Sequence, residues 1–97
     1  MMDVLLHVTN PDSARAGAAL ARACKRAGIV WGCFLTNDGV RALAHPPFAE
    51  ALRAASRAVA CEKSWRQHLG ATPCSVELGS QTDNSALMAQ ARRLVSL

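Results

Sequence analysis

Ile29-Val30-Trp31-Gly32-Cys33-Phe34-Leu35 is a nearly continuous apolar run. This composition is typical of a strand buried on both faces of a parallel sheet, because a strand with one wet face alternates apolar and polar residues. The stretch just before it, residues 14–27, repeats apolar residues at three- and four-residue steps, as an amphipathic helix does. Gly28 follows as a typical C-terminal stop. The sequence therefore predicts a helix that leads into a buried strand.

Another short apolar run covers residues 3–8, and Thr9-Asn10-Pro11-Asp12-Ser13 follows it. Proline and helix-capping side chains are typical of a turn that ends in a helix start. Residues 3–35 are then expected to form a strand, a helix and a second strand. The crossover of such a unit is right-handed in nearly all parallel sheets.

Strands and helices are expected to keep alternating after residue 35. Thr36-Asn37-Asp38-Gly39 and His45-Pro46-Pro47 are two breaks, because glycine and proline interrupt regular structure. The expected elements are helices at 40–44 and 48–55, a strand at 57–61, a helix at 62–69, a weak strand at 75–78, a polar loop at 79–84, a helix at 85–91 and a strand at 94–97. This alternation predicts an α/β fold: a flavodoxin-like, open, mostly parallel sheet of about five strands flanked by helices, in a single domain over residues 1–97.

The composition is that of a small folded domain. Apolar residues make up 51% of the 97 residues and charged residues 19%, unlike the composition of disordered chains. Eleven Lys and Arg against seven Asp and Glu give a net charge of +4, but the basic residues are scattered and only two Trp and two Phe accompany them. We therefore expect no nucleic-acid partner. No apolar segment is long enough to predict a membrane span.

The cysteines show no pairing pattern. Cys24, Cys33, Cys61 and Cys74 contain no Cys-x-x-Cys motif, and residues 1–7 lack the features of a secretory signal. We therefore expect reduced thiols in a cytoplasmic protein. The three histidines show no ligand spacing either, so we predict neither a metal site nor a cofactor. Cys24 on a helix face and Cys33 within a strand are expected to be packing residues, and Cys74 is expected to be inert.

Cys61 is the strongest candidate for chemistry. It lies where a predicted strand ends and a helix begins, and the positive end of a helix dipole favours the nucleophilic thiolate. Lys63 and Arg66 would add positive potential, whereas Glu62 opposes it or pairs with Arg66 at four-residue spacing. The alternative is a structural role. Cys61 also falls on one helical stripe with Trp65 and Leu69, as a small buried residue would.

The loops at the carboxyl ends of the strands are the expected ligand region, because parallel sheets bind ligands there. His7 stands near the end of the first strand and is predicted either to face the Cys61 pocket as a proton donor or acceptor, or to be a partly buried structural residue. Asn10, Asn37 and Asp38 are candidates for binding, or for shaping the turns. The glycines match neither a dinucleotide-binding nor a Walker pattern.

The layout resembles the DsrE-like family, which includes the DsrEFH and TusBCD sulfur-relay subunits. The likeness covers nearly the whole chain. It rests on Val4 to Val8 with Thr9-Asn10-Pro11, on Phe34 to Val40, on Val59-Ala60-Cys61 before a helix, and on Arg93 to Leu97. The resemblance implies that Cys61 accepts sulfane sulfur as a persulfide from one protein and passes it to another. It also implies a homo-oligomer, a trimer or hexamer.

The chain departs from relatives that carry a second cysteine three residues after the first, because Ser64 stands there. A single thiol can still carry a persulfide if the next acceptor belongs to another protein. Two further hypotheses remain open. One is a noncatalytic DsrE-like oligomeric or regulatory subunit with a buried Cys61. The other is a small anion- or nucleotide-binding domain that uses helix N-termini at Ser13, Asp38 and Asn84.

Overall fold

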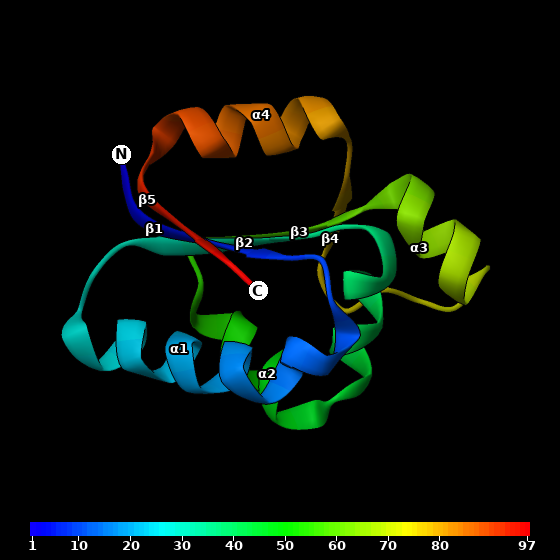
Figure 1. The fold of residues 1–97 in the computed structure, drawn as a ribbon, viewed down its shortest axis with the longest axis horizontal. Helices are drawn as coiled ribbons and strands as arrows, with labels where there is room; N and C mark the ends of the chain where they lie inside the picture. The colour runs from blue at the N-terminus through cyan, green and yellow to red at the C-terminus, as the bar shows by residue number, and fades with distance from the viewer.

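Five parallel strands form one open sheet in the computed structural model, which describes residues 1–97 (Figure 1). The central strand β2 is buried along its whole length, as predicted, but it begins at Trp31, two residues after the start of the apolar run, and Val30 is exposed. The sheet order is β4-β3-β2-β1-β5. The strands are β1 (Met2–Val8), β2 (Trp31–Leu35), β3 (Arg57–Cys61), β4 (Glu77–Gly79) and β5 (Ala91–Ser96). The predicted flavodoxin-like α/β arrangement is therefore confirmed.

Helices cover both faces of the sheet. α1 (Ala14–Ala27) and α2 (Pro46–Ala51) lie on one face, and α4 (Gln81–Gln90) lies alone on the other (Figure 1). α3 (Glu62–Leu69) extends beyond the carboxyl ends of the strands. The core is correspondingly divided in two. The smaller cluster, on the α4 face, consists of Met2, Leu5, Phe34, Val59, Cys61 and Leu87.

The expected bounds of α1 are confirmed. The Asn10 side chain accepts a hydrogen bond from the Asp12 N–H (2.9 Å) and begins the short 3-10 turn that leads into the helix. At the other end, Gly28 has φ 68°, and its N–H bonds back to carbonyl oxygens of the last turn. A left-handed residue at this position favours glycine, because a Cβ would be strained there.

The middle connection differs from the expectation in its details. A 3-10 helix covers Asn37–Ala44, so it starts three residues before the predicted one. α2 begins at Pro46 rather than after the prolines, because the first helical positions need no N–H donor and tolerate proline. It ends at Ala51 and continues as a 3-10 turn.

The predicted polar loop at 79–84 is wrong, because α4 begins at Gln81 instead of residue 85. Ser80 is its N-cap, and a reciprocal pair of bonds with Asp83 forms a capping box. The helix N-termini expected at Asp38 and Asn84 are therefore displaced to Asn37 and Gln81. β5 likewise begins at Ala91, three residues before the expected start.

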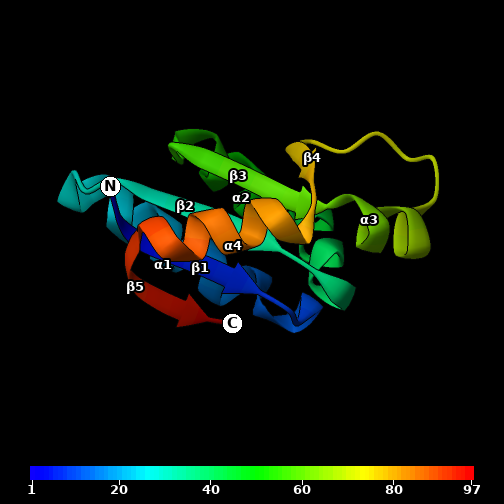
Figure 2. The same ribbon diagram turned by 90° about the horizontal axis from the view of Figure 1, so that it is seen from above.

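The connections that leave β3 and β4 diverge. The chain after β3 becomes α3, which packs against the Asn37–Ala44 helix, whereas the chain after β4 crosses to α4 on the opposite face (Figures 1 and 2). Such a divergence between neighbouring strands opens a crevice at the carboxyl edge of a parallel sheet. None of the helices has the length and apolar composition needed to cross a membrane.

Candidate functional site

Cys61 lies at this divergence. It is the last residue of β3 and the N-cap of α3, and 5% of its surface is exposed. It forms part of the wall of a cleft of about 740 Å³ between the ends of β3 and β4. The other lining residues are Thr36, Asn37, Glu62, Lys63, Ser64, Gln67, Leu78, Gly79, Ser80, Gln81 and Asp83.

Hydroxyl and amide groups from three elements surround the thiol. Thr36 follows β2, Ser64 lies in the first turn of α3, and Gln81 is the first residue of α4. Gln81 Nε2 donates to Thr36 Oγ1 (3.2 Å), and the hydroxyls of Thr36 and Ser64 are 3.5 Å apart. Both hydroxyl residues are 6% exposed. We call Thr36, Ser64 and Gln81 the donor cage of Cys61.

The donor cage favours the thiolate. Burial by itself raises the pKa of Cys61, but the neighbouring hydrogen-bond donors, which are the Ser64 hydroxyl and N–H, Gln81 and Thr36, outweigh it and lower the pKa below that of an ordinary thiol. The N-terminus of α3 acts in the same direction. Burial raises the pKa of Cys24, Cys33 and Cys74 instead. Cys61 is thus the one cysteine whose surroundings stabilise the nucleophilic form.

Asn37 contributes through its backbone. It is the one non-glycine residue with positive φ (53°), a conformation that Asn tolerates better than most residues. Its N–H donates to Ser64 Oγ (2.9 Å). Because that oxygen accepts from Asn37, the Ser64 hydroxyl proton is free to be donated to the sulfur.

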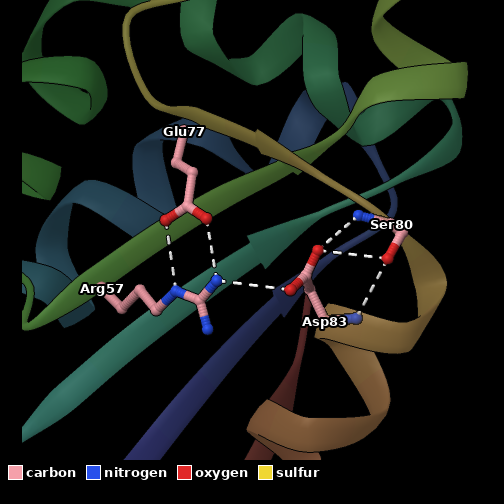
Figure 3. Close-up of polar contacts among 4 residues, drawn as sticks. All are labelled: Arg57, Glu77, Ser80 and Asp83. Atoms are coloured by element: carbon pink, nitrogen blue, oxygen red, sulfur yellow. Dashed lines mark hydrogen bonds and ion pairs between the residues drawn. The ribbon is translucent and has the colours of Figure 1, made fainter.

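A second polar network fixes the far wall of the cleft (Figure 3). Arg57 makes two bonds to Glu77 (2.8 and 3.2 Å) and contacts Asp83 at 3.4 Å, which ties β3, β4 and α4 together. Asp83 accepts from the Ser80 N–H (2.7 Å) and hydroxyl (3.1 Å). The Ser80 backbone and side-chain bonds, followed by Arg57, lower the pKa of Asp83. The network therefore holds the first turn of α4, and with it Gln81, beside the thiol.

The structure brings only some of the predicted site residues together. Lys63 and Asn37 line the cleft with Cys61. Asp38 is exposed and bonds with Arg41 and with His68 Nδ1 (3.4 and 3.1 Å). Two others also lie outside the cleft: Asn10, which caps a turn, and Arg66, which is exposed and 3.8 Å from Glu62.

His7 does not reach the thiol directly. It lies under α4 and stacks on Phe34, with ring centroids 5.9 Å apart. In the strand register His7 is opposite Phe34, which is opposite Val59. Cys61 is therefore two strands away and two residues further along, roughly 12 Å between Cα atoms. His7 is half-buried, as one of its two expected roles required.

The donor cage was not identified from the sequence. Thr36 was assigned to an interruption of regular structure after the second predicted strand. Ser64 was noted only because it occupies the position where some relatives have a second cysteine. Gln81 was placed in a loop, although Ser80-Gln81-Thr82-Asp83 has the spacing of a capping box and would have indicated the helix start. The packing role considered for Cys61 is compatible with its site, because Cys61 and Trp65 are both buried while Cys61 also borders the cleft.

The site combines a stabilised thiolate with a polar cleft, which suits a nucleophile that attacks a partner's sulfur or an electrophilic carbon. No three His, Cys, Asp or Glu side chains lie close enough together to hold a metal ion. No known protein family matches the chain, and neither does any curated protein.

Proposed function

We propose that this protein is a DsrE-like sulfur carrier in which Cys61 accepts sulfane sulfur as a persulfide and passes it on. The donor cage is the observation that carries this proposal. A sulfur acceptor must be a thiolate to attack, and Ser64, Gln81 and Thr36 lower the pKa of Cys61 although the residue is buried.

The proposed loading step is a thiolate exchange. Cys61 Sγ attacks the terminal sulfur of a donor persulfide, R–S–SH. A new S–S bond forms at Cys61, the donor's S–S bond breaks, and the donor leaves as a thiolate that takes up the proton of the transferred sulfur. No electrons are gained or lost overall. Unloading is the same exchange with the next thiol as attacker.

The cleft supports a carrier role. It offers room beyond Sγ for one more sulfur atom, and its donors can hold the charge of a terminal persulfide. Ser64 occupies the position of a second thiol, so Cys61 cannot discharge its sulfur by forming a local disulfide there. Transfer then requires a thiol of another protein. Donor and acceptor are therefore proteins in this proposal, in a reducing compartment such as the cytoplasm, and the carrier itself is a trimer or hexamer.

Intact-mass spectrometry of the native protein tests the proposal. The wild type, Cys61→Ser and Cys74→Ser are each incubated with glutathione persulfide and measured before and after reduction. We expect a reducible gain of one sulfur atom in the wild type and in Cys74→Ser, and none in Cys61→Ser. Cys74 is the control because it is the one cysteine that is not buried, so its thiol is at least as accessible as that of Cys61. Equal loading of all three proteins would contradict the proposal.

The low exposure of Cys61 supports one second candidate, a noncatalytic DsrE-like subunit. In that case Cys61 would react with an alkylating agent only after unfolding. The anion-binding alternative has less support, because Glu62 and Asp83 add negative charge to the same cleft.

A further inference from the structure

The side of α4 that carries Leu87 begins with two amide side chains. Gln81, Asn84, Leu87 and Ala91 follow one another at steps of three or four residues, and Leu87 is the one fully buried member of the helix. Gln81 is exposed, but Asn84 is half-buried, and an apolar residue at 84 would bury more apolar surface against the sheet. A polar residue at such a position conflicts locally with packing, and such conflicts are concentrated at functional sites.

These amides form a chain of hydrogen bonds that reaches the donor cage. Asn84 Nδ2 donates to Gln81 Oε1 (3.2 Å), and Gln81 Nε2 donates to Thr36 Oγ1 (3.2 Å). Because the oxygen of the Gln81 amide is held by Asn84, its nitrogen must face Thr36 and Cys61. A reversed Gln81 amide would present an oxygen to the thiolate and repel it.

Two buried polar atoms meet at the other end of this chain. His7 Nε2 and Asn84 Oδ1 are both inaccessible, and neither has a hydrogen-bond partner of standard geometry. Asn84 is nevertheless close enough to His7 to oppose the effect of burial, which lowers the pKa of the imidazole. One atom is an acceptor and the other can carry a proton, so they are complementary. Leaving both unpaired costs free energy, which a small rotation of the Asn84 amide would recover.

We propose that His7, Asn84 and Gln81 form a positioning relay for Cys61, in which the His7 Nε2–H donates to Asn84 Oδ1 and thereby orients both amides toward the donor cage. The imidazole is itself held by stacking on Phe34, with an interplanar angle of 13°. No proton travels along the relay. It fixes which atom of each amide faces which neighbour, and this sets the stability of the thiolate.

This inference rests on the site of the proposed function, but it concerns the acidity of Cys61 and not the identity of its substrate. Its test is therefore the pH dependence of Cys61 alkylation by iodoacetamide, measured peptide by peptide with mass spectrometry. Cys74 in the same molecules is the internal reference. The charged groups of the elements that line the cleft, Glu62 and Lys63 of α3 and Asp83 of α4, are unchanged in every variant.

Three variants and one control separate positioning from packing. His7→Phe keeps a ring on Phe34 and removes the donor. Asn84→Leu keeps the size and removes both polar atoms. His7→Gln restores an N–H near the Nε2 position. Ser85→Ala is the control, because Ser85 is the exposed neighbour of Asn84 on α4.

We expect His7→Phe and Asn84→Leu to slow Cys61 alkylation near neutral pH by about threefold or more, because each unit of increase in thiol pKa lowers the thiolate fraction about tenfold. His7→Gln should stay within about twofold of the wild type, and Ser85→Ala should be unchanged. Thermal unfolding checks that each variant is folded. Both variants remove a buried unpaired atom, so a purely structural role predicts retained or increased stability and an unchanged alkylation profile. That result would overturn the relay.

The relay and the carrier function can fail separately. If Cys61 never takes up sulfur but its pKa rises in His7→Phe and Asn84→Leu, the carrier proposal is wrong and the relay stands. If Cys61 loads sulfur and its pKa is the same in all variants, the relay is wrong and the carrier proposal stands.

Discussion

Gln81 Nε2 donates a hydrogen bond to Thr36 Oγ1 over 3.2 Å, and the two residues are 45 positions apart in the sequence. This contact joins the start of α4 to the residue that follows β2, with Cys61 at the end of the neighbouring strand β3. The donors that stabilise the thiolate therefore come together only in the folded protein.

The four cysteines should react with iodoacetamide in a defined order. Cys61 should label first near neutral pH, because its pKa is lowered and it borders the cleft. Cys74 should follow, since it is partly exposed but has a raised pKa. Cys24 and Cys33 lie in the larger core away from the cleft and have raised pKa values, so both should label only after unfolding. Peptide-resolved mass spectrometry over time measures the order, and early labelling of Cys33 would show that the sheet opens in solution.

The stability difference between the wild type and Cys61→Ser should depend on pH. The pKa of Cys61 is lower in the folded state than the value of about 8.5 in an unfolded chain, so ionisation stabilises the folded protein. This contribution is complete above the unfolded pKa and is lost as the pH falls through the folded pKa. Urea unfolding of both proteins under reducing conditions, from pH 6 to about pH 9.5, should show the difference moving in favour of the wild type as the pH rises. Cys24 and Cys33 are common to both proteins, so their effects cancel.

Removal of the α4 cap should destabilise the protein. Ser80→Ala loses the side chain that accepts from the Asp83 N–H (3.3 Å), and the loss of an N-cap costs about 1 kcal/mol. For a domain of this size, that lowers the melting temperature by about 4–8 °C. Thr82→Ala, at an exposed position in the same turn, is the control. Circular dichroism measures both transitions, and equal melting temperatures would mean that the cap contributes nothing.

Gly39 should not tolerate a side chain. A Cβ at this position would lie 2.6 Å from the carbonyl carbon of Val8 and 2.8 Å from the Cα of Thr9, and backbone cannot move away as a flexible side chain would. We expect Gly39→Ala to lower the free energy of unfolding by about 1–3 kcal/mol. Arg41→Ala in the same helix is exposed and should change it by less than about 1 kcal/mol. Urea denaturation of both variants distinguishes this packing effect from a general sensitivity of the helix.

The elements that could be predicted from the sequence are those with strong local signals. α1 was predicted with its observed bounds because its apolar spacing, turn and terminal glycine agree. β3 and α3 were also placed correctly. α4 was misplaced because its first four residues, 81–84, are all polar, a composition that is typical of a loop.

Cys61 was identified from its position at a strand end and helix start, a local property. Thr36 and Gln81 could not be, because they become neighbours of the thiol only through the order of the strands. The same reason applies to His7. Its sequence position left open whether it faces the pocket or is a partly buried structural residue, and only the register of β1, β2 and β3 shows that it lies away from the cleft.

The position of β1 between β2 and β5 has a consequence for biosynthesis (Figure 2). Met2 of β1 is paired with Ala91 of β5. One side of β1 therefore stays unpaired until β5 has left the ribosome. Closing so long a loop is slow, and an unpaired strand edge readily pairs with another chain. Until β5 is available, the nascent protein therefore carries its future inner strand as an exposed edge.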